Sequence, residues 1–416
     1  MNHIPGSRFF LVALCACALV AAALLSARPS LNVARAKGRR ETTWRVLAPV
    51  GFKNLTIFPI KGPDAASGDY VTLDAGTKSG TIVIAERGTV QAARRRTPER
   101  ANRQVRQAVS YNSDGASVNE LALVNKSGKK LLLLAGEVIV GGQQDRIVQE
   151  DRIIPPVSVP IALNVFCVEH GRWTPRATSY SGGGGAGEGG GGGSGSGGGG
   201  GVANGVARER APILVSPERA PAAAPAPQVL EDSPAKFSSL GAVAHPKLRA
   251  AAQDKKDQSA VWSEVSANNT KLGTENATGT YQEVYANPQV GAQLDDYIKA
   301  LEREVLQPGV VGVVVARNGR PVWVDIFANS SLFAQYWPKL LKSYAVDALG
   351  DDRDDKRPTI EEATRYLQDR DGAVSTTTQD GVYQLAKTEN PAYAVFELRD
   401  ISLADPLRLH FNKMDR

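Results

Sequence analysis

Glu137 is the first residue of the chain whose setting suits chemistry. It follows Ala135-Gly136 at the end of an apolar run that begins at Leu131. A carboxylate at a strand end can act as a general base, as a metal ligand or as an acceptor for ligand hydroxyls. The alternative is a structural carboxylate that pairs with Arg146 or accepts backbone N–H groups, and the sequence favours this alternative.

Gln143, Gln144, Asp145 and Arg146 follow within one short segment. Amide and guanidinium groups suit the recognition of phosphate, carboxylate or sugar hydroxyls. They do not titrate near neutral pH, so they are weak candidates for acid–base catalysis. Gln143, Gln144 and Arg146 are therefore predicted to bind a ligand.

A second polar segment contains Glu169, His170 and Arg172. Glu169 and Arg172 are further candidate ligand-binding residues. His170 has the chemistry of a general acid or base, but we expect a surface histidine. Cys167 lies in the apolar stretch Ile161 to Val168, which predicts a buried structural thiol rather than a nucleophile.

The motifs of common metal and cofactor sites are missing from the sequence. It contains no paired histidines or cysteines at metal-ligand spacing and no calcium-binding loop. It also lacks a P-loop and a Gly-x-Ser-x-Gly elbow. The sequence therefore predicts neither a metal nor a cofactor.

The first half of the chain has the pattern of a β-rich region, with short β-branched runs between turn residues. Pro155, Pro156 and Pro160 are expected to bound the last strand. The predicted strands are Leu55–Ile60, Tyr70–Leu73, Thr81–Ile84, Leu121–Val124, Lys130–Leu134, Val138–Val140 and Ile161–Val168.

Helices appear in the second half, where apolar residues recur at spacings of three and four. Asn318-Gly319 predicts a type I′ hairpin, and Ser330 or Ser331 is expected to cap a helix. Trp262 and Trp337 are predicted to lie in the core. The predicted helices are Ala260–Val265, Leu294–Leu306, Leu332–Leu349 and Glu361–Leu367, and the strands are Val310–Val315, Val322–Phe327, Val382–Leu385, Tyr393–Leu398 and Leu407–Phe411.

An insertion separates the two halves. Glycine makes up 16 of the 21 residues from Ser181 to Gly201, and an Ala/Pro stretch follows. Such composition predicts disorder over residues 177–235. Neither half looks self-sufficient, so we predict one α+β domain, with an antiparallel β-rich part (44–176) packed on the helices of a second part (236–413).

The N-terminus resembles an export signal. Arg8 precedes 17 apolar residues, Phe9 to Leu25, and Ala34-Arg35-Ala36 or Ser26-Ala27 offers a cleavage site. A signal peptide within residues 1–36 is expected, with an uncleaved anchor as the alternative. The predicted location is periplasmic or extracellular, with membrane contact only through residues 9–25 if they are uncleaved.

The formal charge of +6 is spread unevenly along the chain. Nucleic-acid binding is not expected, because the arginine tract has few aromatic residues among its charges. A solvated segment is expected, and contact with anionic lipid or an envelope polymer is the alternative. The tract contains Arg94, Arg95, Arg96, Arg100, Arg103 and Arg106.

The two polar segments, together with Lys247-Leu-Arg249, Val261-Trp262 and Phe333 to Tyr344, resemble one family. The chain is similar to the ARG and rhodanese-phosphatase-superfamily-associated protein domain over roughly residues 50–350. The family pattern reads Gly-Glu and then Gly-Ala-Lys-Gln-Asn-Arg, and this chain departs from it at Gln143 and Asp145. The family name implies an association with ADP-ribosyl-glycohydrolase and phosphatase-like proteins.

These observations lead to two hypotheses about function. The favoured one is a binding or interaction module of the cell envelope without catalytic activity, whose partner is an envelope protein or a small anionic ligand. The alternative is an enzyme acting on a phosphate- or ADP-ribose-like molecule, with Glu137 as general base. The alternative requires Glu137 to lie in one pocket with Gln144 and Arg146.

Overall fold

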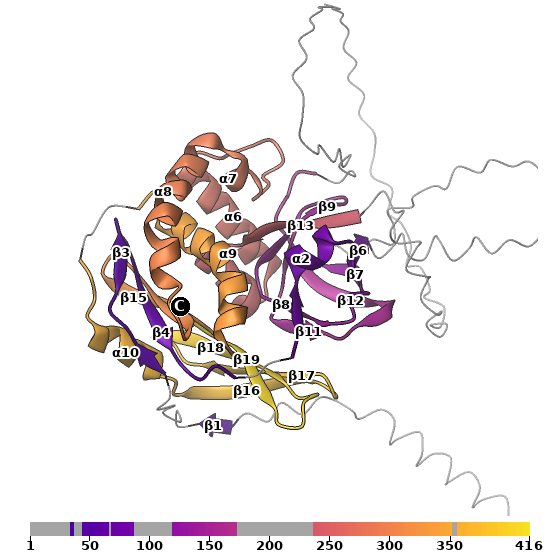
Figure 1. The fold of residues 1–416 in the computed structure, drawn as a ribbon. Coiled ribbons are helices and arrows are strands. Elements are labelled where there is room, and N and C mark those ends of the chain that lie inside the picture. The colour runs from indigo at the N-terminus through magenta and orange to yellow at the C-terminus, as the bar shows by residue number, and fades with distance from the viewer. Residues whose placement is uncertain (1–33, 37–43, 66–67, 87–118, 173–235, 352–355) are drawn as a thin grey trace, which may run out of the picture.

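A computed structural model describes residues 34–36, 44–65, 68–86, 119–172, 236–351 and 356–416 of the protein (Figure 1). Three predictions lie outside these residues: the apolar run 9–25, the arginine tract 94–106 and the insertion 177–235. No helix in the described part is long and apolar enough to cross a bilayer.

A ten-stranded antiparallel sheet forms the largest element. It combines both halves of the chain, because β4 pairs with β14. Its order is β1 (Ala34–Ala36), β16 (Gly372–Gln379), β17 (Tyr383–Glu389), β18 (Tyr393–Asp400), β19 (Leu407–Asp415), β15 (Arg320–Phe327), β14 (Val310–Arg317), β4 (Leu55–Lys61) and β2 (Arg45–Val46), with β3 (Val50–Phe52) also on β4. The predicted hairpin is confirmed, since Asn318 and Gly319 both have positive φ, 49° and 74°.

A six-stranded closed barrel is the second β element. Its order is β10 (Arg146–Val148), β12 (Val157–Cys167), β7 (Glu120–Asn125), β6 (Ile82–Glu86), β13 (Lys236–Val243) and β9 (Glu137–Gly141). Strand β13 follows the insertion and closes the barrel by pairing with β6 and β9. The halves are therefore interleaved, which confirms a single α+β domain interrupted by an insertion.

Three further strands, β5 (Tyr70–Thr72), β8 (Lys130–Leu133) and β11 (Arg152–Ile154), make a small separate sheet. Pro160 lies within β12 and not at its boundary. The register of β12 with β7 shifts between Val157 and Ile161, the segment that contains Pro160. A shift of this kind tolerates the missing N–H of proline. Strand β16 was not predicted, because its sequence is polar and mostly exposed.

Helices cover both faces of the ten-stranded sheet. The helices are α2 (Leu73–Lys78), α5 (Pro246–Ala250) with a π-helical turn at Ala251–Lys255, α6 (Gln258–Leu272), α7 (Glu283–Ala286), α8 (Pro288–Val305), α9 (Ser330–Ala348) and α10 (Ile360–Gln368). On β4, Ile57 faces the cluster containing α8 and α9, whereas its neighbour Phe58 faces the cluster containing α10. Helix α9 begins after Asn329, whose side chain accepts the N–H of Leu332, so the prediction of a serine cap was wrong.

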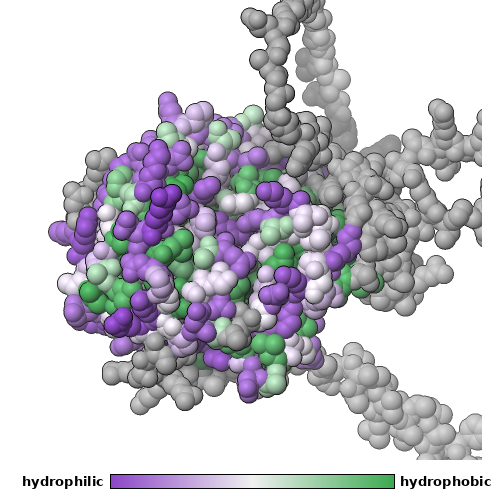
Figure 2. Space-filling view, viewed as in Figure 1, coloured by the Kyte–Doolittle hydropathy of each residue, from purple (hydrophilic) through white to green (hydrophobic). Residues whose placement is uncertain are grey.

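The described residues expose few large apolar side chains. On the face shown in Figure 2, hydrophobic residues form small patches among hydrophilic ones. The large apolar side chains exposed in the described part are Val159, Leu306 and Ile360, on three different elements or connections. Exposed residues scattered in this way need no explanation by binding.

A buried polar network, which we call the Asp325 network, joins the ten-stranded sheet to helices α5 and α9 and to Asp151 beside the barrel. Its centre is the carboxylate of Asp325 on β15, which has no exposed surface. Arg249 of α5 donates two hydrogen bonds to it, at 2.9 and 3.2 Å. Trp323, Tyr344 of α9, Asn412 and His410 of β19 also contact this carboxylate.

His410 extends the network to the residues between β10 and β11. Its Nδ1 lies 2.6 Å from Asp151, and its Nε2 lies 3.0 Å from Asp325. Burial acts to lower the pKa of His410, but the two carboxylates outweigh it and raise the pKa from 6.5 to about 9. Burial likewise acts to raise the pKa of Asp325, but Arg249 and His410 outweigh it and lower the pKa. His410 is therefore protonated at neutral pH.

The raised pKa of His410 predicts a pH dependence of stability. A shift of this size stabilises the folded protein by about 3 kcal/mol. This stabilisation is complete below pH 6.5, the unfolded pKa, and is lost as the pH rises through about 9. His410→Gln should remove this dependence and lower the free energy of unfolding at neutral pH, as measured by denaturant titration at a series of pH values. His170→Gln, an exposed control, should keep it. A wild-type profile that is flat between the two pKa values would contradict the assignment.

Candidate functional site

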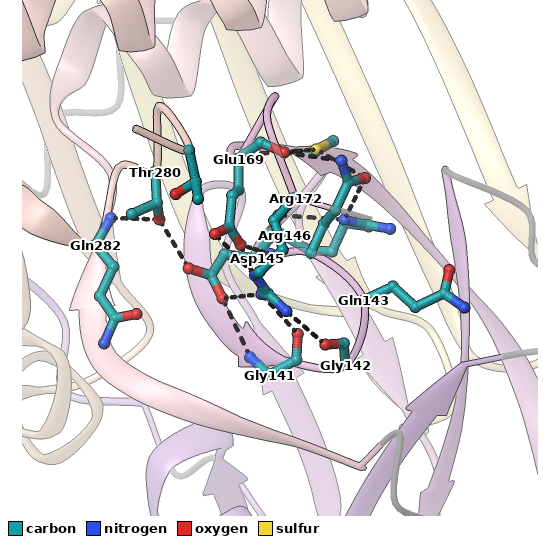
Figure 3. Close-up of polar contacts among 12 residues, drawn as sticks. Gly141, Gly142, Gln143, Asp145, Arg146, Glu169, Arg172, Thr280 and Gln282 are labelled. Carbon is teal, nitrogen blue, oxygen red and sulfur yellow. Dashed lines mark hydrogen bonds and ion pairs between the residues drawn. The ribbon is translucent and has the colours of Figure 1, made fainter. Parts of the chain in front are cut away.

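Four strand ends meet at one end of the barrel, which we call the barrel mouth. Strand β10 begins at Arg146, whose register partner is Cys167 at the end of β12. Strand β9 ends at Gly141 opposite Phe237 of β13, and β6 ends at Glu86. The loop 142–145 connects β9 to β10 there. Most of the predicted ligand-binding residues therefore lie at one place in the fold (Figure 3).

Arg172 organises the outer part of the mouth. Its guanidinium contacts Glu169 at 2.6 and 2.8 Å and Asp145 at 3.4 Å, and it donates to the carbonyl of Gly142. Burial acts to raise the pKa of Glu169, but hydrogen bonds from Arg172 and the backbone N–H of Asp145 outweigh it and lower the pKa. Two predicted ligand-binding residues, Glu169 and Arg172, thus hold the loop in place through their mutual contacts.

Asp145 fixes the same loop from the inside. It accepts the backbone N–H of Gly141 at 3.2 Å and the hydroxyl of Thr280 at 2.8 Å. Gln144 donates to the carbonyl of Glu169, and its oxygen accepts from Arg146 and from the thiol of Cys167. Burial raises the pKa of Cys167. The cysteine is therefore a buried thiol, as predicted.

Arg146 uses only some of its hydrogen-bonding groups among the described residues. The residue has no exposed surface. Its Nη1 donates to Gln144 at 3.2 Å and to the carbonyl of Asp145 at 3.4 Å. Its Nε and Nη2 have no hydrogen-bond partner in the described part of the chain. A buried guanidinium with unused donors is costly, so this feature of the site calls for a partner.

Glu86 and Gln143 complete the mouth. The backbone N–H of Gln143 donates to Glu86 at 3.0 Å, while the side-chain oxygen of Gln143 is buried without a partner among the described residues. Burial raises the pKa of Glu86, although Gln143, Arg146 and Arg172 act to lower it. The sequence analysis missed Glu86, yet the position carries the signal noted for Glu137, a carboxylate beside an apolar strand.

Glu137 lies apart from these residues, at the opposite end of β9. Its carboxylate is 2.5 Å from the ammonium group of Lys339 on α9 and accepts the N–H of Leu134. Lys339 also contacts Asp74 of α2 at 3.0 Å. Burial acts to lower the pKa of Lys339, but Glu137 and Asp74 outweigh it and raise the pKa. Glu137 thus has the expected structural role, with Lys339 rather than Arg146 as its partner.

A comparison with family models identifies the family of the chain. A family model for the ARG and Rhodanese-Phosphatase-superfamily-associated Protein domain matches residues 43–188 and 231–397. The chain belongs to this family. The unmatched residues 189–230 between the two parts lie within the predicted insertion. No curated protein and no solved structure matches the chain.

Several family motifs serve the interior of the ARG and Rhodanese-Phosphatase-superfamily-associated Protein domain. Arg249 and Tyr344 bind Asp325, and Lys339 binds Glu137. No group of three or more potential metal ligands occurs among the residues that the structure describes. The described part of the mouth therefore combines amides, guanidinium groups and carboxylates, which bind ligands by hydrogen bonds and charge.

The ion pair of Glu137 predicts a stability defect. Glu137→Gln should lower the free energy of unfolding by about 3 kcal/mol, because Lys339 stays buried with only Asp74 as a charged partner. The double variant Glu137→Gln/Lys339→Met should recover part of this loss, as measured by denaturant unfolding.

Asp296→Asn is the matched control, since its pair with Lys53 lies at the surface. It should change stability by less than about 1 kcal/mol. If Glu137→Gln and Asp296→Asn lowered the free energy of unfolding equally, the buried pair would stabilise the protein no more than a surface pair.

Proposed function

We propose that the protein is a binding module of the cell envelope and that Arg146 holds the phosphate or carboxylate group of a small ligand at the barrel mouth. The observation that carries this proposal is the fully buried guanidinium whose Nε and Nη2 have no partner in the described structure. These adjacent donors suit a bidentate contact with two oxygens of an anion.

Access to Arg146 leads past the loop 142–145. Arg146 itself has no exposed surface, whereas Gln143 on this loop is half-buried. Gly142 lies against Phe237, where any side chain at residue 142 would collide with the ring. A ligand would therefore enter by displacing Gln143, whose amide is then placed to contact it. This route favours a small ligand over a protein segment.

Binding is a better proposal than catalysis on chemical grounds. The thiol of Cys167 has a raised pKa, so it is a poor nucleophile. Glu137, the candidate base, is held by Lys339 at the far end of β9. The side chain that Arg146 contacts directly is the amide of Gln144, and amides neither donate nor accept protons near neutral pH. The arrangement favours the hypothesis of a module without turnover.

A thermal-shift assay tests the anion site. Inorganic phosphate, citrate and ADP-ribose are added to the full chain and compared with sodium chloride at equal ionic strength. A ligand at ~100 times its dissociation constant should stabilise by about 2.7 kcal/mol. Arg146→Met should abolish this stabilisation, because it removes the donors and keeps most of the side-chain volume.

Arg320→Gln provides the control, since Arg320 is an exposed surface arginine. This variant should keep the anion response. If Arg146→Met does not fold, Gln143→Ala should weaken the response, since Gln143 lies over the proposed entry. Stabilisation no greater than that of chloride, or an undiminished response in Arg146→Met, would refute an anion site at Arg146.

Export to the envelope is the second part of the proposal, and β1 bears on the cleavage site. Residues 34–36 pair with Gly372–Val374 of β16 and extend the ten-stranded sheet. Cleavage after Ala36 would remove this strand, whereas cleavage after Ala27 would keep it. N-terminal sequencing of the exported protein should therefore begin at Arg28. A mature protein that begins at Lys37 would contradict this choice, and one that keeps Met1 would favour an anchor.

A further inference from the structure

A cavity distinct from the barrel mouth lies between α6 and the residues that follow it. Its volume is about 350 Å³, which is within the range of small-ligand sites. The residues lining it are His170, Trp262, Val265, Ser266, Asn269, Thr270, Glu275, Asn276 and Gly279. The sequence analysis assigned none of these residues to a ligand.

One face of α6 forms the first wall of the cavity. Trp262, Ser266 and Thr270 follow one another at spacings of four residues, so they share a face of the helix. Trp262 is half-buried rather than fully in the core, which corrects its prediction. The exposed ring of His170 stands nearly perpendicular to it, at 78° with centroids 4.6 Å apart. The two rings give this wall an apolar aromatic corner.

The opposite wall is a loop held rigidly by its own hydrogen bonds. The side-chain oxygen of Asn276 accepts the backbone N–H groups of Thr278 and Thr280. The carbonyl of Thr278 accepts the N–H of Gly171 at 2.8 Å, which fixes the loop beside His170. The cavity is therefore preformed, so binding would cost little ordering of the chain.

The polar groups of the cavity suit a neutral ligand that is rich in hydroxyls. Ser266 has no hydrogen-bond partner among the described residues, and the carboxylate of Glu275 has only the hydroxyl of Thr270. No lysine or arginine lines the cavity among the residues that the structure describes, so an anion has no cationic partner from them. A side-chain hydroxyl can donate to and accept from ligand hydroxyls, and a carboxylate accepts from them, while aromatic rings pack on apolar C–H surfaces.

A sugar ring has both features, an apolar C–H face and a rim of hydroxyl groups. We propose that this cavity, between Trp262 and His170 on one side and Glu275 on the other, is a binding site for a neutral carbohydrate. The aromatic corner would pack on the sugar face, and Ser266 and Glu275 would hydrogen-bond its hydroxyls. This site does not depend on the anion site at Arg146.

Titration of the full chain with sugars tests the proposal. The probes are glucose, galactose, N-acetylglucosamine and the β-1,4-linked tetramer of N-acetylglucosamine, followed by ligand-observed NMR and by tryptophan fluorescence. We expect at least one probe to bind with a dissociation constant of roughly 1 mM or below. The fluorescence change should disappear in Trp262→Phe, because Trp262 lines the cavity.

Two variants of exposed residues keep the test independent of folding. Ser266→Trp should fill the cavity and abolish binding, and His170→Ala should weaken it by about tenfold, the value of one aromatic contact. Ser263→Trp is the matched control, since Ser263 is exposed on α6 but does not line the cavity. It should bind as the wild type does.

Three results would overturn the proposal. The first is that no probe binds, and the second is that binding survives Ser266→Trp. The third is that Arg146→Met abolishes sugar binding while Ser266→Trp does not, which would place the sugar at the barrel mouth instead.

Discussion

Burying the charge of Asp325 imposes the main constraint on this fold. A carboxylate without solvent is stable only when donors surround it, and Asp325 collects donors from α5, α9, β15 and β19. Through His410 it also reaches Asp151 on the barrel side. Each of these elements must be in place before the charge is compensated. The network therefore links the formation of the sheet to the docking of the helices.

The buried pair of Glu137 and Lys339 also joins distant elements, but it involves fewer of them. Lys339 ties α9 to Glu137 of the barrel and to Asp74 of α2. The family resemblance rests in part on these very residues, Glu137, Arg249, Lys339 and Tyr344. In the structure these side chains form buried contacts, Glu137 with Lys339 and both Arg249 and Tyr344 with Asp325.

The barrel mouth and the α6 cavity contain polar groups that these two networks do not use. At the mouth, two donors of Arg146 lack a partner in the part of the chain that the structure describes. In the cavity, Ser266 and the His170–Trp262 corner face open volume. Thr280 lies between the two sites, since its hydroxyl binds Asp145 while the neighbouring Gly279 lines the cavity. The proposed anion site and the proposed sugar site are therefore neighbours that use different side chains.

Local pattern was enough to predict much of the fold. Alternating β-branched runs, the Asn318-Gly319 turn and the apolar spacing in α8 act over neighbouring residues, and the structure confirms them. The interruption of a single domain could also be predicted, because neither half could bury its apolar faces alone. Strand β16 was missed because it is polar and mostly exposed. The predicted serine cap of α9 was wrong, because the choice of Asn329 depends on side-chain contacts that periodicity does not show.

The candidate site depended on tertiary structure. Glu137 and Arg146 lie nine positions apart in one motif, yet they have different partners: Glu137 opens β9 and binds Lys339, whereas Arg146 opens β10 opposite Ile139 and donates to Gln144. Sequence therefore determined which residue types are present and that they suit binding. Only the packing of helices and strands from distant parts of the chain decided that Glu137 meets Lys339 and that His170 and Trp262 share a cavity. The same packing leaves two donors of Arg146 without a partner among the described residues.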